Sequence, residues 1–334
     1  GVFQSPKVLG ENCETPSTSP YTFEGECVGP FVIPSDVEVI NKGIINQGTG
    51  FWEAAGAVST PDGGATLLSF TNAVDGTVRG QRYGIVINGG IGTSTTIQTL
   101  TNDGMVEVDA GSAISSFNSS IETLTNSGTI TGSNRSIENW GRITTLMNEV
   151  DGTINGVVDN SNGGVIGNFT NKGTLNGAES GRFGLTAIFN TGRIDELTNE
   201  TTGKIDGKIY FRPSLDSIRL FTNKGEITGV LLVDGVGSQP SLLNQSDASI
   251  RTDTVNVSVI EVTNAANTLV SNAGVIASRL ADTDAYATGS YGVTLAGGSD
   301  TLNNRVGGII GGDTAGVQVG NAVGDGSQAS ITNS

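Results

Sequence analysis

The sequence predicts an all-β fold, a right-handed parallel β-helix in which about 12 to 14 short coils stack into a rod roughly 60 Å long. Two observations carry this prediction. A phrase of Asn, Gly and apolar residues recurs along the chain, and its copies follow one another at intervals of 20 to 28 residues. Because a solenoid adds its core coil by coil, one elongated domain can hold most of the 334 residues.

In each copy of the phrase an apolar residue, often followed by Thr, precedes the Asn. Gly follows two residues after the Asn and an apolar residue four after it, as in Leu100–Val106 and Leu124–Ile130. A longer form, such as Phe70–Val78, has two extra residues before the next apolar position. Since side chains alternate along a strand with a period of two, we expect the corner loop to hold the extra residues.

The Asn residues of the phrase are expected to form a ladder, pointing inward or along the rod. Asn and Gly tolerate the positive φ that sharp corners require, and stacked Asn side chains can hydrogen-bond at the strand spacing of about 4.8 Å. The first series consists of Asn102, Asn126, Asn148, Asn171, Asn199, Asn223, Asn244 and Asn264. An offset series, which predicts a second Asn-Gly corner in some coils, consists of Asn139, Asn160, Asn190 and Asn272.

The first part of the chain differs from the rest. Residues 1–35 lack the phrase, contain five of the eight prolines, and are expected to cap the open strand edges of the first coil. They also contain Cys13 and Cys27, for which we predict a disulfide because the chain looks exported; two free thiols are the alternative. Residues 36–334 are assigned to the β-helix, which is expected to be truncated because Ile331–Ser334 is a phrase cut off midway.

The phrase leaves wider gaps that are predicted to protrude as loops. They lie at 47–69, 79–98, 206–220, 230–242 and 277–300. Exposed aromatic side chains could stack on sugar rings, and the candidates for such a contact include Trp52, Trp140, Tyr210 and Phe211. The alternative for each is packing against the rod.

The composition limits the classes of function that this chain can have. The net charge is −16, which repels phosphate backbones and anionic lipids, so nucleic acid is not an expected partner. No apolar run approaches 18 residues, so no transmembrane helix is predicted. His is absent, which removes the commonest general base and the commonest metal ligand. With no nucleotide-binding or calcium-binding motif either, we expect no enzyme activity, no cofactor and no metal site.

Paired carboxylates leave glycoside hydrolysis as an alternative function. Asp195 and Glu196 are adjacent, and adjacent residues of a strand point to opposite faces, which makes them a poor catalytic pair. Asp282 and Asp284 would share a side but lie in a predicted loop. Scattered surface acids are the favoured interpretation of both pairs.

The phrases Leu124–Gly132 and Phe169–Leu175 resemble the repeats of bacterial autotransporter passenger domains, and the resemblance extends over roughly residues 36–334. It implies export, translocation across the outer membrane and display at the bacterial cell surface, either anchored or secreted. The two N-terminal Cys depart from the family, whose passengers commonly lack them.

The resemblance and the composition together predict a non-enzymatic adhesin that mediates cell–cell aggregation, biofilm formation or host attachment. Its partners would be a second copy of the chain or a glycan or protein of a host or bacterial surface. Many weak polar contacts along one face of the rod, multiplied by many copies on a cell, would provide the binding. The alternatives are a β-helix that binds or cleaves polysaccharide and a structural stalk.

Overall fold

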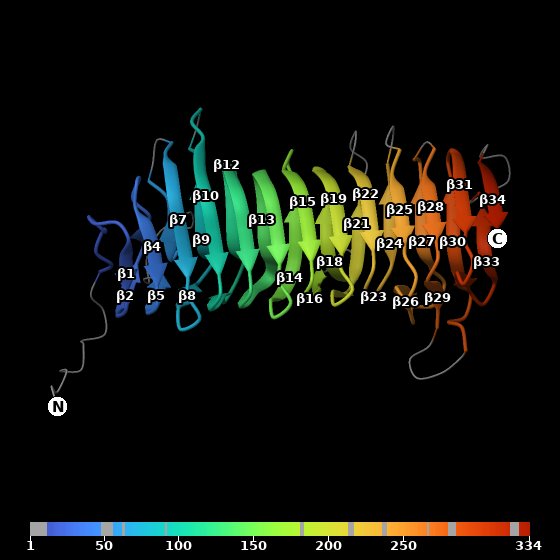
Figure 1. Ribbon diagram of the computed structural model, residues 1–334, viewed down its shortest axis with the longest axis horizontal. Coiled ribbons are helices and arrows are strands. Elements are labelled where there is room, and N and C mark those ends of the chain that lie inside the picture. Colours follow the sequence, from blue (N-terminus) through green and yellow to red (C-terminus); the bar gives the residue numbers. More distant parts are fainter. Residues whose placement is uncertain are drawn as a thin grey trace.

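The computed structural model describes residues 12–47, 56–61, 64–90, 92–180, 184–212, 217–235, 239–265, 267–279, 285–320 and 327–334. All regular elements within these residues are β-strands, and they wind into a single parallel β-helix whose coils follow one another along the long axis (Figure 1). Each full coil passes through three sheet faces in the same order, and we name them A, B and C. The predicted all-β parallel β-helix is confirmed.

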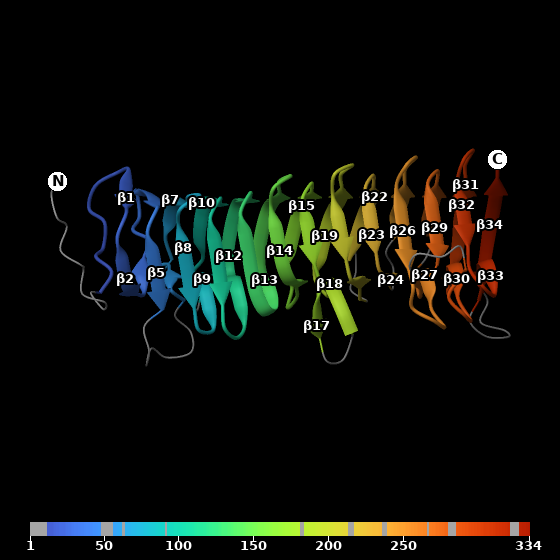
Figure 2. The same cartoon turned by 90° about the horizontal axis from the view of Figure 1, so that it is seen from below.

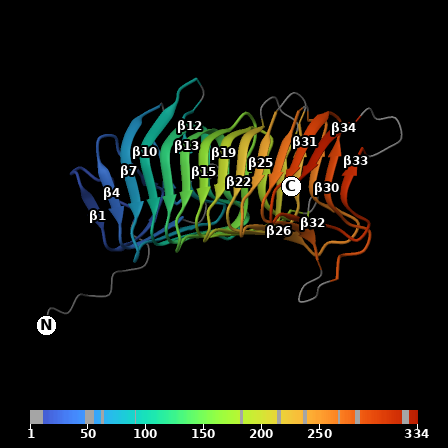
Figure 3. The ribbon, with the colours of Figure 1, turned by 45° about the vertical axis from the view of Figure 1, so that its right-hand side comes forward.

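Face A contains the strands that end at the Asn of the recurring phrase. They are β1 (Tyr21–Phe23), β4 (Glu38–Asn41), β7 (Thr66–Asn72), β10 (Thr95–Asn102), the ends of β12 (Ser112–Asn126) and β13 (Thr129–Asn148), β15 (Val165–Asn171), β19 (Arg193–Asn199), β22 (Ile218–Asn223), β25 (Ser241–Asn244), β28 (Leu269–Asn272), β31 (Ser299–Asn304) and β34 (Gln328–Asn333). Figure 3 shows them side by side along the rod. They define coils 1 to 13 within the described residues.

Face B follows after the Asn corner. It consists of β2 (Glu26–Gly29), β5 (Ile44–Gln47), β8 (Thr77–Gly80), β11 (Met105–Val108), the starts of β13 and β14 (Thr153–Asn160), β16 (Thr174–Asn176), β20 (Lys204–Asp206), β23 (Glu226–Thr228), β26 (Ser249–Thr252), β29 (Val275–Ser278) and β32 (Ile309–Gly311). Register is kept across corners of different length: Thr77 of a long corner pairs with Met105 of a short one. The two extra residues therefore lie in the corner, as expected.

Face C completes each coil. It consists of β3 (Phe31–Val32), β6 (Val58–Ser59), β9 (Tyr83–Asn88), the start of β12, the middle of β13, the end of β14, β18 (Gly184–Asn190), β21 (Lys208–Phe211), β24 (Leu231–Asp234), β27 (Ser258–Thr263), β30 (Tyr291–Ala296) and β33 (Ala315–Val319). One further strand, β17 (Ala178–Ser180), pairs antiparallel with β18 and forms a hairpin that projects from the rod (Figure 2).

The prediction that the wide gaps are loops is wrong for four of them. Residues 79–98, 206–220, 230–242 and 277–300 contain the face C strands β9, β21, β24 and β30. These strands lack the Asn phrase because apolar residues, such as Ile209 and Phe211 of β21, fill their inward positions. The gap at 47–69 contains β6 and the start of β7, and part of it lies outside the described residues.

The core is one continuous apolar cluster that follows the axis from Cys27 to Leu302. Alternate residues of each strand point inward and stack on their register partners in the coils on either side. On face A, for example, Leu100 aligns with Leu124, and Leu124 with Leu146, all fully buried. Since each coil covers the apolar residues of its neighbours, no coil can bury them alone.

The coils begin before residue 36, where the sequence placed the end of the cap. Strands β1, β2 and β3 already pair in parallel with β4, β5 and β6 of the next coil. The prolines made this coil hard to recognise in the sequence, since proline is rare within strands. Pro30 and Pro34 in fact lie at the corners of the coil, beside its strands. The preceding segment is tied to the first coil by the Cys13–Cys27 disulfide, which confirms that prediction, and by a parallel bridge between Asn12 and Val28.

The explanation of the corner glycines by positive φ is wrong. Among the described residues with positive φ, none is an inward Asn of face A or the Gly that closes its corner. These glycines are needed because neighbouring coils approach closely. A Cβ at Gly104 would lie 2.2 Å from the carbonyl oxygen of Gly76, and a Cβ at Gly128 would lie 2.1 Å from that of Gly104.

Candidate functional site

The amide ladder runs along the inner edge of face A. From Asn41 onward each Nδ2 donates a hydrogen bond of 2.8 to 2.9 Å to the Oδ1 of the Asn in the next coil. Its members are Asn41, Asn72, Asn102, Asn126, Asn148, Asn171, Asn199, Asn223, Asn244, Asn272, Asn304 and Asn333. Seven of the eight residues in the first predicted series belong to it. Asn272 belongs here as well, and Asn264 does not, since it is exposed and has positive φ.

Each ladder amide from Asn41 to Asn304 is also bonded to the backbone. Asn102 Nδ2 lies 3.3 Å from the carbonyl oxygen of Gly104 in its own corner and 3.1 Å from that of Thr129 in the next coil. The ladder residues in the middle of the rod are buried. Their side chains therefore hold the coils in register and are closed to a ligand.

A second, shorter ladder lies where face C turns into face A. Asn139 donates to Asn160, and Asn160 donates to Asn190, over 2.7 Å each. The register position that follows Asn190 is occupied by Phe211, which is fully buried. The prediction that Phe211 contacts a ligand is therefore wrong, because the alternation of β21 points this side chain into the core.

The other candidate aromatics are not brought together. Trp140 is 41% exposed and makes an edge contact with Phe117, with ring centroids 4.9 Å apart. Tyr210 is partly buried and makes an edge contact with Phe189 at 5.8 Å. Trp140 lies in coil 5 and Tyr210 in coil 8, and Trp52 lies outside the described residues. The described candidates Trp140 and Tyr210 therefore do not share one platform for a sugar chain.

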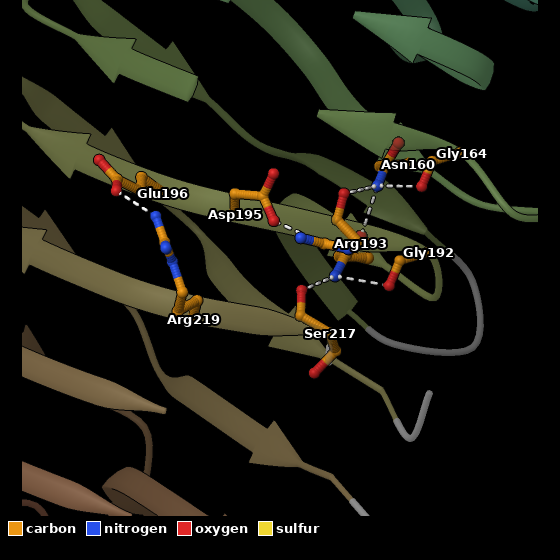
Figure 4. A network of polar contacts seen from close by, with 9 residues as sticks. Asn160, Gly164, Gly192, Arg193, Asp195, Glu196, Ser217 and Arg219 are labelled. Atoms are coloured by element: carbon orange, nitrogen blue, oxygen red, sulfur yellow. Dashed lines mark hydrogen bonds and ion pairs between the residues drawn. The ribbon is translucent and has the colours of Figure 1, made fainter. Parts of the chain in front are cut away.

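The one described acid pair of the enzyme alternative, Asp195 and Glu196, does not converge. Asp195 bonds to Arg193, and Glu196 bonds to Arg219 of the next coil, so the two carboxylates point to different arginines (Figure 4). Asp282 and Asp284 lie outside the described residues.

The sequence analysis missed one convergent pair, Glu138 and Asp159, which are register partners on face C. They are only 3% and 4% exposed, and Arg135 bridges both carboxylates. Ser112 donates a further 2.7 Å bond to Glu138. A polysaccharide could not reach this pair, since both carboxylates are buried.

Face A presents two outward rows of side chains, three residues and one residue before each ladder Asn. From coil 3 to coil 13 the first row is Ser69, Thr99, Thr123, Thr145, Asn168, Glu196, Leu220, Ser241, Leu269, Thr301 and Ser330. The second row is Thr71, Thr101, Thr125, Met147, Thr170, Thr198, Thr222, Leu243, Ser271, Asn303 and Thr332. The Thr of the recurring phrase belongs to the second row.

These two rows form a surface that is rich in hydroxyl groups and nearly free of charge, in which Thr222 and Ser271 are buried. Glu196 is the single charged residue among the positions of both rows, and Arg219 pairs with it. Hydroxyls of neighbouring coils repeat at about 4.8 Å, and the two rows lie about 7 Å apart along the strands. We refer to these rows of coils 3 to 13 as the hydroxyl face.

Face B contrasts with the hydroxyl face. Its outward positions include several charged side chains of both signs, namely Glu26, Arg79, Glu107, Lys204, Asp206, Glu226 and Arg251. Arg79 and Glu107 pair across adjacent coils. The near absence of charge belongs to the two rows and not to the whole of face A, because earlier positions of its strands carry the exposed side chains of Glu122, Arg142, Arg193 and Arg219.

Comparisons of the chain with protein-family models, curated proteins and solved structures find no match. Across the described ranges no helix is long and apolar enough to cross a membrane. The same residues contain no group of three or more His, Cys, Asp or Glu side chains that could hold a metal ion.

One interior carboxylate should respond to pH. Asp300 is 3% exposed, and burial raises the pKa of its carboxyl above the ordinary value, opposed by hydrogen bonds from Thr268. A carboxyl whose pKa is higher in the folded than in the unfolded chain binds more protons when folded. Its contribution to stability therefore falls as pH rises through the interval between the two pKa values.

We expect Asp300→Asn to raise the melting temperature at pH 7, because it removes the buried charge and keeps an oxygen that can accept the 2.9 Å bond from the Thr268 N–H. At about pH 3, where the carboxyl is protonated in both states, the gain should vanish. Thermal unfolding followed by circular dichroism at both pH values checks this. Asp75→Asn, at an exposed corner, is the control. A gain of the same size at both pH values would contradict the argument.

Proposed function

We propose that the protein is a non-enzymatic rod of the autotransporter passenger type, displayed at the bacterial surface, which associates side by side with copies of itself through the hydroxyl face. The observation that carries the proposal is the near absence of charge in the two outward rows of face A. The resemblance of the repeats supports display at a cell surface. The Cys13–Cys27 disulfide supports an oxidising compartment outside the cytosol.

Electrostatics favours this face as the contact. Two rods that each carry a net charge of −16 repel each other, and the repulsion is smallest where neither surface places carboxylates opposite the other. The regular spacing of Thr and Ser along the hydroxyl face offers one donor and two acceptor positions per hydroxyl in an evenly repeated array. Two such arrays can meet in many registers.

Each hydroxyl contact is weak, because a hydrogen bond across the interface replaces bonds to water and contributes only about 1 kcal/mol. Many contacts per rod and many rods per cell multiply this small energy. A single substitution should therefore have little effect, whereas several charges placed on the face should prevent association.

The test uses two matched triple variants. Thr99→Glu, Thr123→Glu and Thr145→Glu place three negative charges in adjacent coils of the hydroxyl face. Thr129→Glu, Thr153→Glu and Thr174→Glu place the same charges in adjacent coils of face B. We expect the face A variant to abolish the settling of bacteria that display the full protein, and the face B variant to leave settling nearly unchanged. Melting curves of both variants control for stability.

Salt provides a second arm of the same test. Association should be weakest at 0.01 M salt, where the Debye length is about 30 Å, and should strengthen toward physiological salt, where it is about 8 Å. Sedimentation of the purified chain measures this directly. The proposal fails if the face A variant still settles like the parent, or if the face B variant loses settling to the same extent.

A further inference from the structure

A groove of about 320 Å³ lies at the corner between faces B and C in coils 7 to 10. One wall is the start of β18, with Leu185, and the other is the corner after β26, with Asp253. Asp206, Lys208 and Leu232 line the space between the walls, together with Glu261 of β27. The groove is separate from the hydroxyl face, since none of its lining residues belongs to face A.

The lengths of the corners create this groove. In coils 8 and 9 the chain turns from face B to face C through only one or two residues, Gly207 and Gly229–Val230. A Cβ at Gly229 would lie 2.2 Å from the carbonyl oxygen of Gly207, so only glycine lets these two short corners pack this closely at the bottom of the groove. Coil 7 inserts the hairpin at the same corner, and coil 10 inserts residues 253–257. Two short corners between two long ones leave the hollow.

The groove holds more negative than positive charge. Three carboxylates, those of Asp206, Asp253 and Glu261, line it together with one ammonium group, that of Lys208. Burial raises the pKa of the Glu261 carboxyl above its ordinary value, the nearby charge of Asp234 raises it further, and Lys208 lowers it. The ionised carboxylate of Glu261 is therefore poorly compensated and would gain from a cation.

The remaining lining indicates what kind of cation fits. Leu185, Val230, Leu232 and Val257 contribute apolar surface beside the carboxylates. A metal ion requires several oxygen ligands converging at about 2.0 to 2.6 Å, and the described residues contain no such group of acids. The groove is also far larger than a single metal ion.

We propose that this groove binds an organic cation, a primary amine on a short alkyl chain, with its ammonium group at Glu261 and its chain along Leu232 and Leu185. The ammonium donates hydrogen bonds to the carboxylate, and the alkyl chain covers the apolar wall. This site goes beyond the proposed association of rods, and either can fail without the other.

The experiment titrates 1,5-diaminopentane into the full chain by calorimetry at low and physiological salt. Glu261→Gln should weaken binding at least tenfold. The control Glu226→Gln removes an exposed carboxylate from face B outside the groove and should change binding less than twofold. Because Glu261→Gln removes a poorly compensated charge, the melting curve of this variant at pH 7 should be no lower than that of the parent.

Two reference ligands distinguish binding at a specific site from the general attraction of cations to a negatively charged rod. Neutral 1,5-pentanediol, which keeps the chain and loses both charges, should bind much more weakly than the diamine. Magnesium chloride at equal ionic strength should compete only partly. The proposal is overturned if Glu261→Gln binds the diamine as the parent does, if the diol binds equally well, or if magnesium displaces the diamine completely.

Discussion

Phe169→Ala is expected to lower the free energy of unfolding by about 3 to 5 kcal/mol. Phe169 is 1% exposed in coil 7, and its register partners are Leu146 in the preceding coil and Leu197 in the following one. Removing the ring leaves a cavity that these neighbours cannot fill, because the amide ladder holds the spacing of the coils. Chemical denaturation measures the loss, and the outward Thr170→Ala on the same strand is the control.

The position of the damage is as informative as its size. In a solenoid each coil contacts only its neighbours, so a defect in coil 7 weakens both of its interfaces and leaves distant coils intact. Hydrogen exchange should therefore speed up over coils 6 to 8 and change little near coils 2 and 12. An equal rise in exchange along the whole rod would show that the molecule unfolds as one cooperative unit, which contradicts this expectation.

Asn171→Ala is expected to lower the free energy of unfolding by about 1 to 3 kcal/mol, the cost of leaving buried polar partners unsatisfied. Its Nδ2 donates to Oδ1 of Asn199 and to the carbonyl oxygens of Gly173 and Lys204, over 2.8, 3.2 and 3.2 Å. Its own Oδ1 accepts from Asn148. Alanine removes all four bonds at once from a fully buried position.

A matched control for this variant lies on the same strand. Asn168 is exposed on the hydroxyl face, three residues before Asn171, and Asn168→Ala should leave the unfolding curve almost unchanged. Association of folded Asn171→Ala rods, measured by sedimentation below the melting transition, should equal that of the parent. Equal losses of stability in the two variants would show that the ladder contributes nothing beyond any other Asn.

The recurring phrase was sufficient to predict the coils from residue 36 onward because one chemical requirement repeats from Asn41 in coil 2 to Asn333 in coil 13. An amide must meet an amide, and a glycine must pass close to a carbonyl, so the residue types themselves mark the corner. Face C has such a requirement only in the coils of its short ladder, Asn139, Asn160 and Asn190. Leu231 and Val233 fill the same inward positions as Ile209 and Phe211, and no residue type distinguishes these strands from a loop.

The candidate sites were harder to predict, for two physical reasons. The side of the strand on which an aromatic residue lies depends on register. Tyr210 and Phe211 are adjacent in sequence, yet Tyr210 is partly exposed and Phe211 is buried. The groove depends on the relative lengths of corners in four successive coils, and its lining extends from Gly184 to Glu261. By contrast, the hydroxyl face had a local signal, the Thr that so often precedes the ladder Asn.

The ladder has a direction. Every step from Asn41 to Asn333 places the NH₂ group toward the later coil and the carbonyl toward the earlier one. Aligned amides polarise one another, and a single reversed amide would set two oxygens face to face on one side and two NH₂ groups on the other. A strand slipped by one residue would bring an outward side chain such as Thr125 into the line instead of Asn126. The direction of the amides therefore favours one register at every coil, because a slipped strand would leave the amides of the neighbouring coils without their partners.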